Sequence, residues 1–359
     1  MDISNASKCV GSAGVSSNII PGLTLPFRTA AMRPRSVQII GTGAFVPERT
    51  VSNEEVGYPA GVDDAWIRRK AGIVSRRWAD PATATSDLAA RAASEALADA
   101  GVAASEISHL VVATSTPDHS QPPTAAIVQD MIHAENAAGY DLNSVCSGFE
   151  FAFNTVAQLN SINHGYSLVI GADVYSRILN PLDRRTVILF GDGAGAVVLG
   201  SSRSGNAPTV IAGKLCTYGR LSGVIRVPMG GSRLPFGTDA NDERRYFQMD
   251  GRSVRAFVTT MLPKVIRSFL SEVGIVPDEV RHLIPHQANG VMLQELVDAM
   301  QFCNLTQHLI VDQYANTGSA SIPLTLDYVR RRNHIASGDL VLMAGFGGGM
   351  SVGLTLIRW

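Results

Sequence analysis

Short apolar runs alternate along this chain with longer segments in which apolar residues recur at helical spacing. The runs are rich in β-branched residues and lie at 37–40, 110–113, 167–170, 186–190, 210–211, 283–284, 309–311 and 340–343. Runs of this length predict strands, and the amphipathic segments between them predict helices. Because the runs are continuously apolar and do not alternate, both faces of the sheet must be covered. The pattern therefore predicts an α/β fold with largely buried central sheets.

The chain contains an internal repeat. Residues 97–111 align with residues 270–284 at a constant offset of 173 without a gap. Both copies are typical of a helix stopped by glycine, a short polar turn with an acid, and a buried strand. A Gly-rich strand ends each copy, at 191–200 and 345–356. We therefore expect two duplicated halves, at 35–205 and 206–359.

Residues 1–34 differ from the rest, because they are rich in Ser, Gly and Ala and contain only Asp2 as an acid. We expect a disordered N-terminal extension, or an upstream start with Met32 as the true first residue. An organellar transit peptide is the alternative. The sequence has neither a secretory signal nor an apolar run of membrane-spanning length, so a cytoplasmic location is predicted.

Charge and cysteine content exclude several classes of protein. The chain has 30 Lys plus Arg against 31 Asp plus Glu, which argues against nucleic acid or an anionic membrane as the main partner. Its four cysteines are far apart and lack histidines at ligand spacing, so neither a disulfide framework nor a metal site is expected. The glycine clusters at 41–43 and 191–195 do not open a helix in the pattern of a dinucleotide-binding turn, so no nicotinamide cofactor is expected.

Cys146 lies where a strand-like run gives way to a helical pattern that includes Phe149 and Phe153. A cysteine at the start of a helix faces free N–H groups and aligned peptide dipoles, which favour the thiolate. We therefore expect a lowered pKa and a nucleophilic role for Cys146. The alternative is a buried cysteine that serves only as a small hydrophobic residue.

Two further polar residues lie at the ends of predicted strands. His286 follows the repeated strand at its carboxyl end, the side on which α/β sheets bind ligands. Asn316 follows the run at 309–314, which we interpret as a third strand, with an ordinary turn or cap as the alternative. Adding the repeat offset to Cys146 gives position 319, close to Asn316, so the two halves are expected to converge on one site. The Gly-rich loop at 229–245 is a candidate wall of its entrance.

These motifs resemble, in family order, those of β-ketoacyl-ACP synthase III, a condensing enzyme of the thiolase fold. The resemblance covers residues 37–359 and rests on Cys146-Ser-Gly-Phe, Pro285-His-Gln-Ala-Asn, Asn316-Thr-Gly-Ser-Ala-Ser and Phe346-Gly-Gly-Gly. It implies a thiolase-like fold with duplicated halves in a layered α-β-α-β-α architecture. Elongating synthases of this superfamily use a second histidine, and degradative thiolases a second cysteine, where this chain has Asn316.

The resemblance implies an acyltransferase that condenses an acyl-CoA primer with malonyl-ACP to give 3-oxoacyl-ACP, the initiation of fatty acid biosynthesis. Cys146 would carry the acyl group, with the backbone N–H groups of Cys146 and Gly348 binding the oxyanion. His286 and Asn316 would donate hydrogen bonds to the malonyl thioester as carbon dioxide leaves. Phe346 would lie near the malonyl carboxylate and disfavour its charged ground state.

The resemblance also marks substrate contacts, some of them altered. Trp66 and Arg184 match the pair that stacks on the adenine of CoA. Lys70 replaces one phosphate-binding arginine and Val291 another, so the bidentate phosphate contacts are lost. Ala256 replaces a basic residue associated with carrier-protein docking. These changes predict weak binding of the priming CoA, or a carrier protein as the acyl donor. CoA and carrier-protein thioesters are expected as substrates, and no resident cofactor is expected.

Asn289, in the loop after His286, is a further substrate-binding candidate. Pro122 matches a residue that, in family homodimers, reaches the partner's acyl pocket, and a rigid turn is the alternative. A homodimer is therefore expected. Two other functions stay open: a starter-unit ketosynthase or acyltransferase of polyketide or specialised metabolism, and a non-catalytic partner subunit, against which Cys146, His286 and Asn316 count.

Overall fold

The computed structural model describes residues 30–163, 165–201, 207–239 and 242–359. Ten strands form one hydrogen-bonded sheet in the order β12-β11-β13-β14-β8-β1-β7-β6-β4-β5, and its two halves meet where Gln38 pairs with Thr209. The strands of the first half are β1 (Gln38–Phe45), β4 (Ile107–Ala113), β5 (Ala138–Leu142), β6 (Tyr166–Val174) and β7 (Asp192–Gly200). Those of the second half are β8 (Thr209–Thr217), β11 (Val280–Pro285), β12 (Thr306–Gln307), β13 (Leu340–Gly347) and β14 (Ser351–Arg358).

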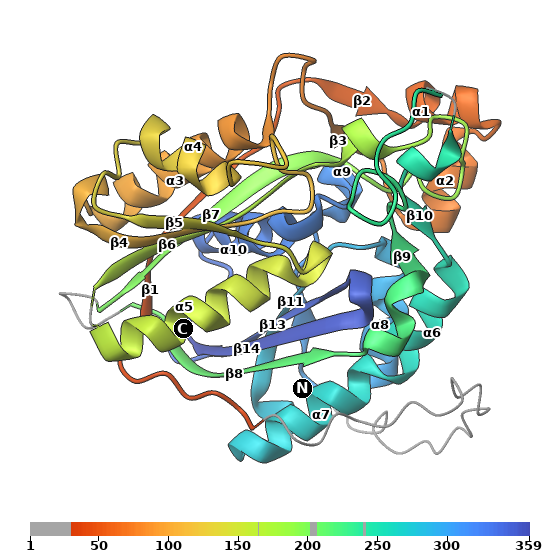
Figure 1. The fold of residues 1–359 in the computed structure, drawn as a ribbon. Coiled ribbons are helices and arrows are strands. Elements are labelled where there is room, and N and C mark those ends of the chain that lie inside the picture. The colour runs from red at the N-terminus through yellow and green to blue at the C-terminus, as the bar shows by residue number, and fades with distance from the viewer. Residues whose placement is uncertain (1–29, 164, 202–206, 240–241) are drawn as a thin grey trace.

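Helices cover both halves and also fill the space between them (Figure 1). Above the first half lie α3 (Thr85–Ala100) and α4 (Thr124–Met131). Between the halves lie α5 (Gly148–Asn163) and α10 (Ser321–Arg331). Against the second half pack α6 (Gly251–Thr260), α7 (Leu262–Val273) and α8 (Gly290–Met300). The result is the expected α-β-α-β-α layering.

The remaining elements gather at the end of the molecule where the two halves open toward each other (Figure 1). They are β2 (Thr50–Ser52), α1 (Asn53–Ala60), α2 (Asp64–Ala71), β3 (Ser75–Arg77), β9 (Ile225–Arg226), β10 (Gln248–Met249) and α9 (Val311–Tyr314).

The repeat predicted from the sequence is present in the topology. When the five strands of each half are numbered in chain order, both halves of the sheet have the order third, second, fourth, fifth, first. Their parallel and antiparallel pairs also match. Gly101 and Gly274, 173 residues apart, end α3 and α7 with φ of 63° and 79°, a left-handed conformation that favours glycine. The turns that precede α5 and α10, Val145–Ser147 and Gly318–Ala320, are also 173 residues apart.

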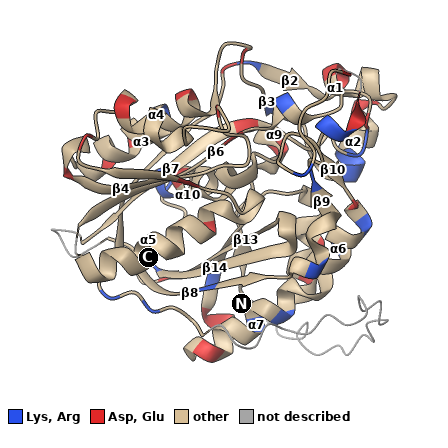
Figure 2. Cartoon of the chain, in the orientation of Figure 1, with Lys and Arg blue, Asp and Glu red and all other residues tan. Residues whose placement is uncertain are grey.

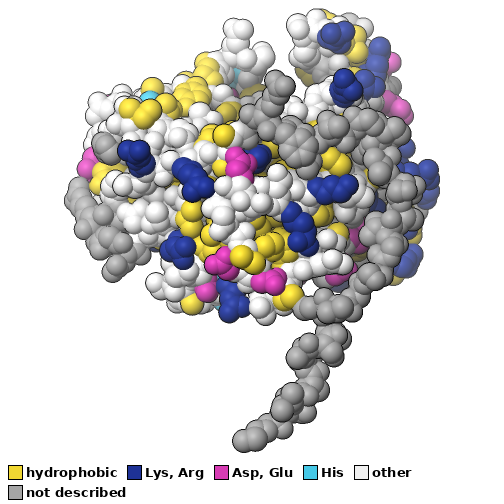
Figure 3. All heavy atoms as spheres, turned by 90° about the horizontal axis from the view of Figure 1, so that it is seen from below, with side chains coloured by type: hydrophobic (Ala, Val, Ile, Leu, Met, Phe, Trp, Pro, Cys, Tyr) yellow, Lys and Arg dark blue, Asp and Glu magenta, His cyan; other side chains and the backbone are white. Residues whose placement is uncertain are grey.

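Strand residues alternate between two cores. Leu110 belongs to the core beneath α3, whereas Val111 packs in the central core with Phe149 and Phe153 of α5. Helix α5 carries only one charged residue, Glu150, as expected for a helix buried on all sides (Figure 2). Charges of both signs instead lie on the outer helices and loops, and on the face seen in Figure 3 they surround apolar side chains. No helix within the described ranges is long and apolar enough to cross a bilayer.

Three boundaries differ from the sequence predictions. The run at 186–190 is a series of turns and contributes only a bridge between Phe190 and Asn316. The run at 309–314 is the short helix α9, and the third strand, β12, lies just before it. Ordered structure begins before residue 35, because Met32 pairs with Gly213 of β8. The prediction of a disordered tail is therefore wrong for residues 30–34, and its part on residues 1–29 lies outside the described residues.

Candidate active site

Cys146 lies in a tight turn pressed against the loop after β13. The preceding residue, Val145, has φ of 50°, which is strained for a β-branched side chain. A Cβ atom added at Gly347 would lie 2.8 Å from the Cβ of Cys146, and one added at Gly348 would lie 2.8 Å from a methyl of Val145. The loop can approach the cysteine this closely only because these positions are glycine.

The thiol of Cys146 is buried, with 5% of the residue exposed. Its sulfur lies 3.9 Å from the phenolic oxygen of Tyr175. Burial, with a smaller contribution from the nearby Asp173, raises the pKa of the Cys146 thiol to about 12. The expectation of a lowered pKa is therefore wrong, because removal of the thiolate from water outweighs the field of the helix start. Nucleophilic attack by Cys146 thus requires a group that accepts its proton.

His286 follows β11 and is held by backbone and side-chain contacts. Its N–H donates to Ala344 at 2.9 Å, and its Nδ1 lies 2.7 Å from the Ser321 hydroxyl. That hydroxyl accepts from the N–H of Gln287 at 3.3 Å, so its own proton is available to Nδ1. This arrangement favours the tautomer with the proton on Nε2. Burial lowers the pKa of His286 to about 3, so the ring is a neutral hydrogen-bond donor.

Asn316 is fixed by its backbone and by one end of its amide. Its N–H donates to Leu189 at 2.9 Å, and its carbonyl accepts from Gly191 at 3.0 Å. Its side-chain oxygen accepts from the N–H of Gly318 at 2.9 Å. The amide oxygen is therefore occupied, which leaves the Nδ2 group to donate into the site. The repeat-related counterpart of Cys146 is Ser319, three residues beyond Asn316.

These side chains meet in one cavity of about 450 Å³. Cys146, His286, Asn316 and Phe346 all line it, and the Phe346 ring lies edge-on to His286 with 5.2 Å between ring centroids. Gly347 also lines the cavity, whereas Gly348 lies behind it against Val145 and is not part of the lining. The structure thus brings together the three residues that the sequence suggested for catalysis.

Four of the suggested substrate-binding residues line the same cavity. The guanidinium carbon of Arg184 lies 5.9 Å from the centroid of the Trp66 ring. Asn289 caps α8 by accepting from the N–H of Met292 at 3.1 Å, and donates to the carbonyl of Lys70 at 3.2 Å. Asn289 therefore ties α8 to α2, a structural task that its position in the sequence did not indicate.

Pro122 is exposed and does not line the cavity of its own chain. The sequence-based expectation for this residue involves a partner subunit, so within the single chain it remains a prediction. Val291, where the family has a basic residue, lies at the cavity and is 40% exposed. The rim is therefore apolar at residue 291, in agreement with the expected loss of a phosphate contact there.

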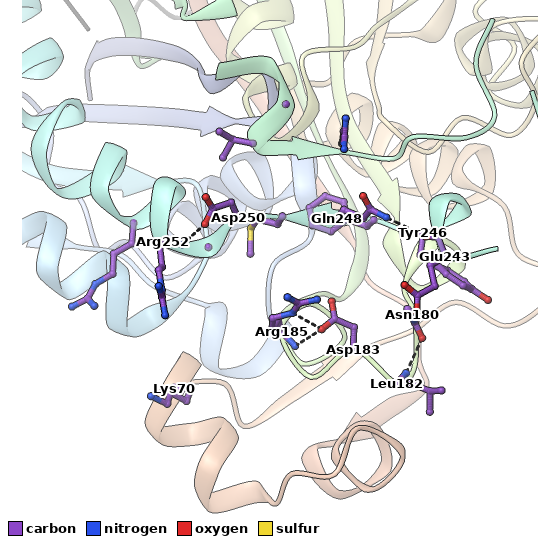
Figure 4. A pocket seen from close by; sticks show the side chains of 17 residues that line it. Lys70, Asn180, Leu182, Asp183, Arg185, Glu243, Tyr246, Gln248, Asp250 and Arg252 are labelled. Carbon is purple, nitrogen blue, oxygen red and sulfur yellow. Dashed lines mark hydrogen bonds and ion pairs between the residues drawn. The ribbon is translucent and has the colours of Figure 1, made fainter. Parts of the chain in front are cut away.

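A wider vestibule of about 1120 Å³ adjoins the cavity (Figure 4). Lys70, Arg185, Phe247 and Arg255 line both spaces, so the vestibule leads to the cavity. The loop at 229–245 contributes Glu243 to the vestibule, as expected of an entrance wall. Sequence reasoning missed Arg185 and Phe247 as lining residues, because they come from elements far apart in the chain.

Ion pairs offset part of the positive charge around the entrance. Arg185 donates to Asp183 at 2.8 Å, as Figure 4 shows, and Arg255 donates to Glu295 at 2.7 Å. Since Arg255 and Glu295 both line the inner cavity, the cation is neutralised where a ligand would enter.

Comparison with known proteins agrees with this geometry. Two family models match the chain: 3-oxoacyl-[acyl-carrier-protein] synthase III at residues 140–219, and the C-terminal part of the same family at residues 270–359. An acetoacetyl CoA synthase from Streptomyces sp. (strain CL190) is 54% identical over 323 residues, which cover 90% of this chain and 98% of that protein. A β-ketoacyl-ACP synthase III from Bordetella petrii is 40% identical over 326 residues, covering 89% and 97% of the two chains.

Solved structures show the same fold. The crystal structure of 3-oxoacyl-ACP synthase III from Aquifex aeolicus VF5 has a TM-score of 0.81 at 31% identity, with 90% of this chain and 100% of that chain covered. The priming β-ketosynthase of the R1128 polyketide pathway has a TM-score of 0.83 at 30% identity, with 94% and 99% covered. The chain therefore belongs to the β-ketoacyl-ACP synthase III family of thiolase-fold, acyl-condensing transferases.

Proposed function

We propose that this protein condenses an acyl thioester with a malonyl thioester, with loss of carbon dioxide, through an acyl group held on Cys146. The observation that carries the proposal is the convergence of Cys146, His286 and Asn316 on one cavity with a wide entrance. The thiol can form a covalent intermediate. The other two groups present N–H donors where negative charge would develop.

In the first half-reaction, the sulfur of Cys146 attacks the carbonyl of an acyl thioester. The backbone N–H groups of Cys146 and Gly348 stabilise the resulting oxyanion, which collapses with release of the coenzyme A thiolate. The close packing of Gly348 on Val145 supports this assignment, because it holds the glycine backbone beside the nucleophile turn. The acyl group remains on the sulfur as a thioester.

In the second half-reaction, Nε2 of His286 and Nδ2 of Asn316 donate to the thioester carbonyl of the malonyl group. Carbon dioxide then leaves, and the two donors stabilise the enolate that remains. The enolate attacks the acyl thioester and expels the sulfur of Cys146. A neutral histidine suits this step, since the low pKa of His286 keeps it a donor of constant charge at physiological pH. The Phe346 ring presents an apolar surface that disfavours the malonyl carboxylate.

The proposed acyl donor is an acyl-CoA. The Trp66–Arg184 pair supports this choice, because an aromatic ring with a guanidinium above it can hold an adenine. The proposed reaction uses coenzyme A and carrier-protein thioesters as substrates and needs no resident cofactor. We further propose a cytoplasmic homodimer, on the basis of the family resemblance.

The malonyl group has two candidate carriers. Malonyl-ACP follows from the family and would place the protein at the start of fatty acid biosynthesis. Malonyl-CoA is the second candidate, because position 256, which the resemblance associates with carrier-protein docking, is uncharged and the neighbouring Arg255 is paired with Glu295. The printed name of the 54% identical relative, acetoacetyl CoA synthase, supports this second candidate.

The proposal is tested by intact-protein mass after brief incubation with a panel of acyl-CoA and acyl-ACP donors, with Cys146→Ser as the matched control. A mass gain confined to the wild type is expected, and its size identifies the preferred acyl group. An adduct that persists in Cys146→Ser would contradict the assignment of the nucleophile. Product analysis with malonyl-ACP and malonyl-CoA, each supplied alone, then decides between the two carriers.

A further inference from the structure

A chain of hydrogen-bonding groups leads from the thiol of Cys146 into the core. The sulfur lies 3.9 Å from the Tyr175 oxygen, which lies 2.9 Å from the Ser115 hydroxyl, which in turn donates to Oδ1 of Asp173 at 3.0 Å. Tyr175, Ser115 and Asp173 do not line the substrate cavity. The chain therefore connects the nucleophile to a carboxyl group that substrate does not reach.

The donors in this chain all point the same way. An ionised carboxylate only accepts, so the single proton of the Ser115 hydroxyl is given to Asp173. Ser115 can then only accept from Tyr175, and the phenol proton is committed to that bond. The remaining position on the Tyr175 oxygen is an acceptor for the S–H of Cys146. Each of the three protons is thus hydrogen-bonded to the group that would receive it.

Asp173 is the buried carboxyl group at the end of this path. It is fully buried, and among the residues that the structure describes no Lys or Arg forms an ion pair with it. Its carboxylate is held by six donated hydrogen bonds, from the Thr114 hydroxyl, the Ser115 N–H and hydroxyl, the Thr116 hydroxyl, and the Ser319 N–H and hydroxyl. Burial raises the pKa of Asp173, and the hydrogen bonds from Ser115 and Ser319 oppose part of this shift.

The middle of the chain is held rigidly. The Tyr175 ring stacks on Phe190 with centroids 4.5 Å apart and meets the edge of Phe247 at 5.8 Å. Gly318, with φ of 60°, presses on both groups: an added Cβ would lie 2.3 Å from Oδ2 of Asp173 and 2.4 Å from the Tyr175 ring. This packing fixes the phenol between sulfur and serine, as a proton path requires.

We propose that Tyr175 and Ser115 relay the thiol proton of Cys146 to Asp173 during acyl loading, an inference that rests on the proposed function. The S–H proton moves to the Tyr175 oxygen, the Tyr175 proton to Ser115, and the Ser115 proton to Oδ1 of Asp173. The sulfur forms its bond to the acyl carbon, and the bond from that carbon to the CoA sulfur breaks. Coenzyme A leaves as a thiolate and takes its proton from solvent.

The same path runs in reverse when the product forms. Attack of the enolate on the acyl group breaks the bond to Cys146 and leaves its sulfur with the electron pair. Tyr175 returns a proton to the sulfur, Ser115 to Tyr175, and Asp173 to Ser115. Asp173 therefore stores one proton between loading and condensation, and the free enzyme is restored without loss or gain of charge.

Tyr175→Phe tests the relay while it keeps the ring that packs on Phe190. The rate of acyl loading, measured as CoA release in a single turnover, is expected to fall about 10²-fold. The rate of loading should also be measured in mixtures of H₂O and D₂O. A plot of this rate against the fraction of D₂O should be curved for the wild type, because several protons move together. For the variant the same plot should be a straight line. The matched control is Tyr218→Phe, since the Tyr218 hydroxyl is buried and has no partner among the described residues.

Asp173→Asn separates the relay from simple electrostatics. Removal of the buried negative charge lowers the thiol pKa, so an electrostatic role predicts faster loading. The relay predicts slower loading despite the larger thiolate fraction, because the proton acceptor is gone. Faster loading in Asp173→Asn, or loading at the wild-type rate in Tyr175→Phe, would overturn the proposal. Should Asp173→Asn fail to fold, Ser115→Ala breaks the path with a smaller change and carries the same expectation.

Alkylation of Cys146 by iodoacetamide keeps this test independent of the condensation reaction. Tyr175 and Asp173 both act on the pKa of the thiol, and His286 lines the same cavity, so the pH at half-maximal alkylation reports their influence. It should rise in Tyr175→Phe, because Tyr175 donates to the sulfur once the thiol proton has moved along the path, and this donor is then missing. It should fall in Asp173→Asn. If wild-type protein forms no acyl adduct but shows these opposite shifts, the proposed function fails and the coupled network stands. If the adduct forms and the shifts are absent, the relay fails.

Discussion

Asn316→Asp changes a single atom of the side chain and should affect the two half-reactions differently. The side-chain oxygen that accepts from the N–H of Gly318 at 2.9 Å is retained, so the local backbone should keep its conformation. The substitution exchanges the Nδ2 donor for a second oxygen, and an ionised carboxyl group can accept hydrogen bonds but cannot donate one. The developing enolate then loses one of its two donors and faces a negative charge.

The size of the effect follows from that exchange. Loss of one donor to an oxyanion typically costs about 10²–10³ in rate, or ~3–4 kcal/mol. Repulsion between carboxylate and enolate adds to this loss, so malonyl decarboxylation should fall at least about 10³-fold. Acyl loading should change less than about tenfold, because its oxyanion is bound by backbone N–H groups and not by Asn316.

Two assays measure the halves separately. Intact-protein mass after acyl-CoA addition follows loading of Cys146, and release of labelled carbon dioxide from malonyl thioester follows decarboxylation. Asn316→Ala, which removes the donor without adding charge, should lie between the wild type and Asn316→Asp in decarboxylation. Equal losses in both assays would refute the assignment of Asn316 to the malonyl carbonyl.

Three further outcomes are expected. Gly347→Ala should destabilise the protein by about 1–3 kcal/mol and impair acyl loading, because the new methyl group would clash with Cys146. The matched control is Gly219→Ala, where an added Cβ meets nothing within 4 Å. Equal melting temperatures of the two variants would argue against the close packing at Gly347. Glu295→Gln frees Arg255 at the rim and should raise kcat/KM for malonyl-ACP several-fold, and by more than it raises kcat/KM for malonyl-CoA. An equal change with both substrates, or none, would show that the ion pair does not control carrier choice. A chain that starts at residue 30 should melt at a higher temperature than one that starts at residue 35, since only the longer one keeps the contacts with β8; identical melting would show that those contacts add no stability.

The sequence predicted the architecture and the convergent residues well, because both leave a local signal. The glycines that end α3 and α7 lie at the repeat offset, and the same offset relates the turn of Cys146 to that of Ser319. Short apolar runs were less informative: those at 186–190 and 309–314 are turns and a short helix, since a run of this length fits several buried conformations.

The properties that depend on three-dimensional packing could not be predicted. The thiol pKa of Cys146 is set by its burial, which the loop of Gly347 helps to create from two hundred residues further along the chain. The contact of Tyr175 with the sulfur is also invisible in the sequence, because nothing near residue 175 distinguishes it from an ordinary core tyrosine. Local sequence patterns identify the reactive side chains, whereas the pKa values of these side chains depend on residues that are distant in the sequence.

The position of β14 has a consequence for how the protein is made. This strand follows the nine others of the sheet in chain order, yet it pairs with β13 on one side and β8 on the other. During synthesis the first half can assemble early, because its strands all precede residue 201. The second half of the sheet stays split until β14 lies between β13 and β8. The loop between β13 and β14, which packs over Cys146, is therefore fixed only after the last of the ten strands has been added.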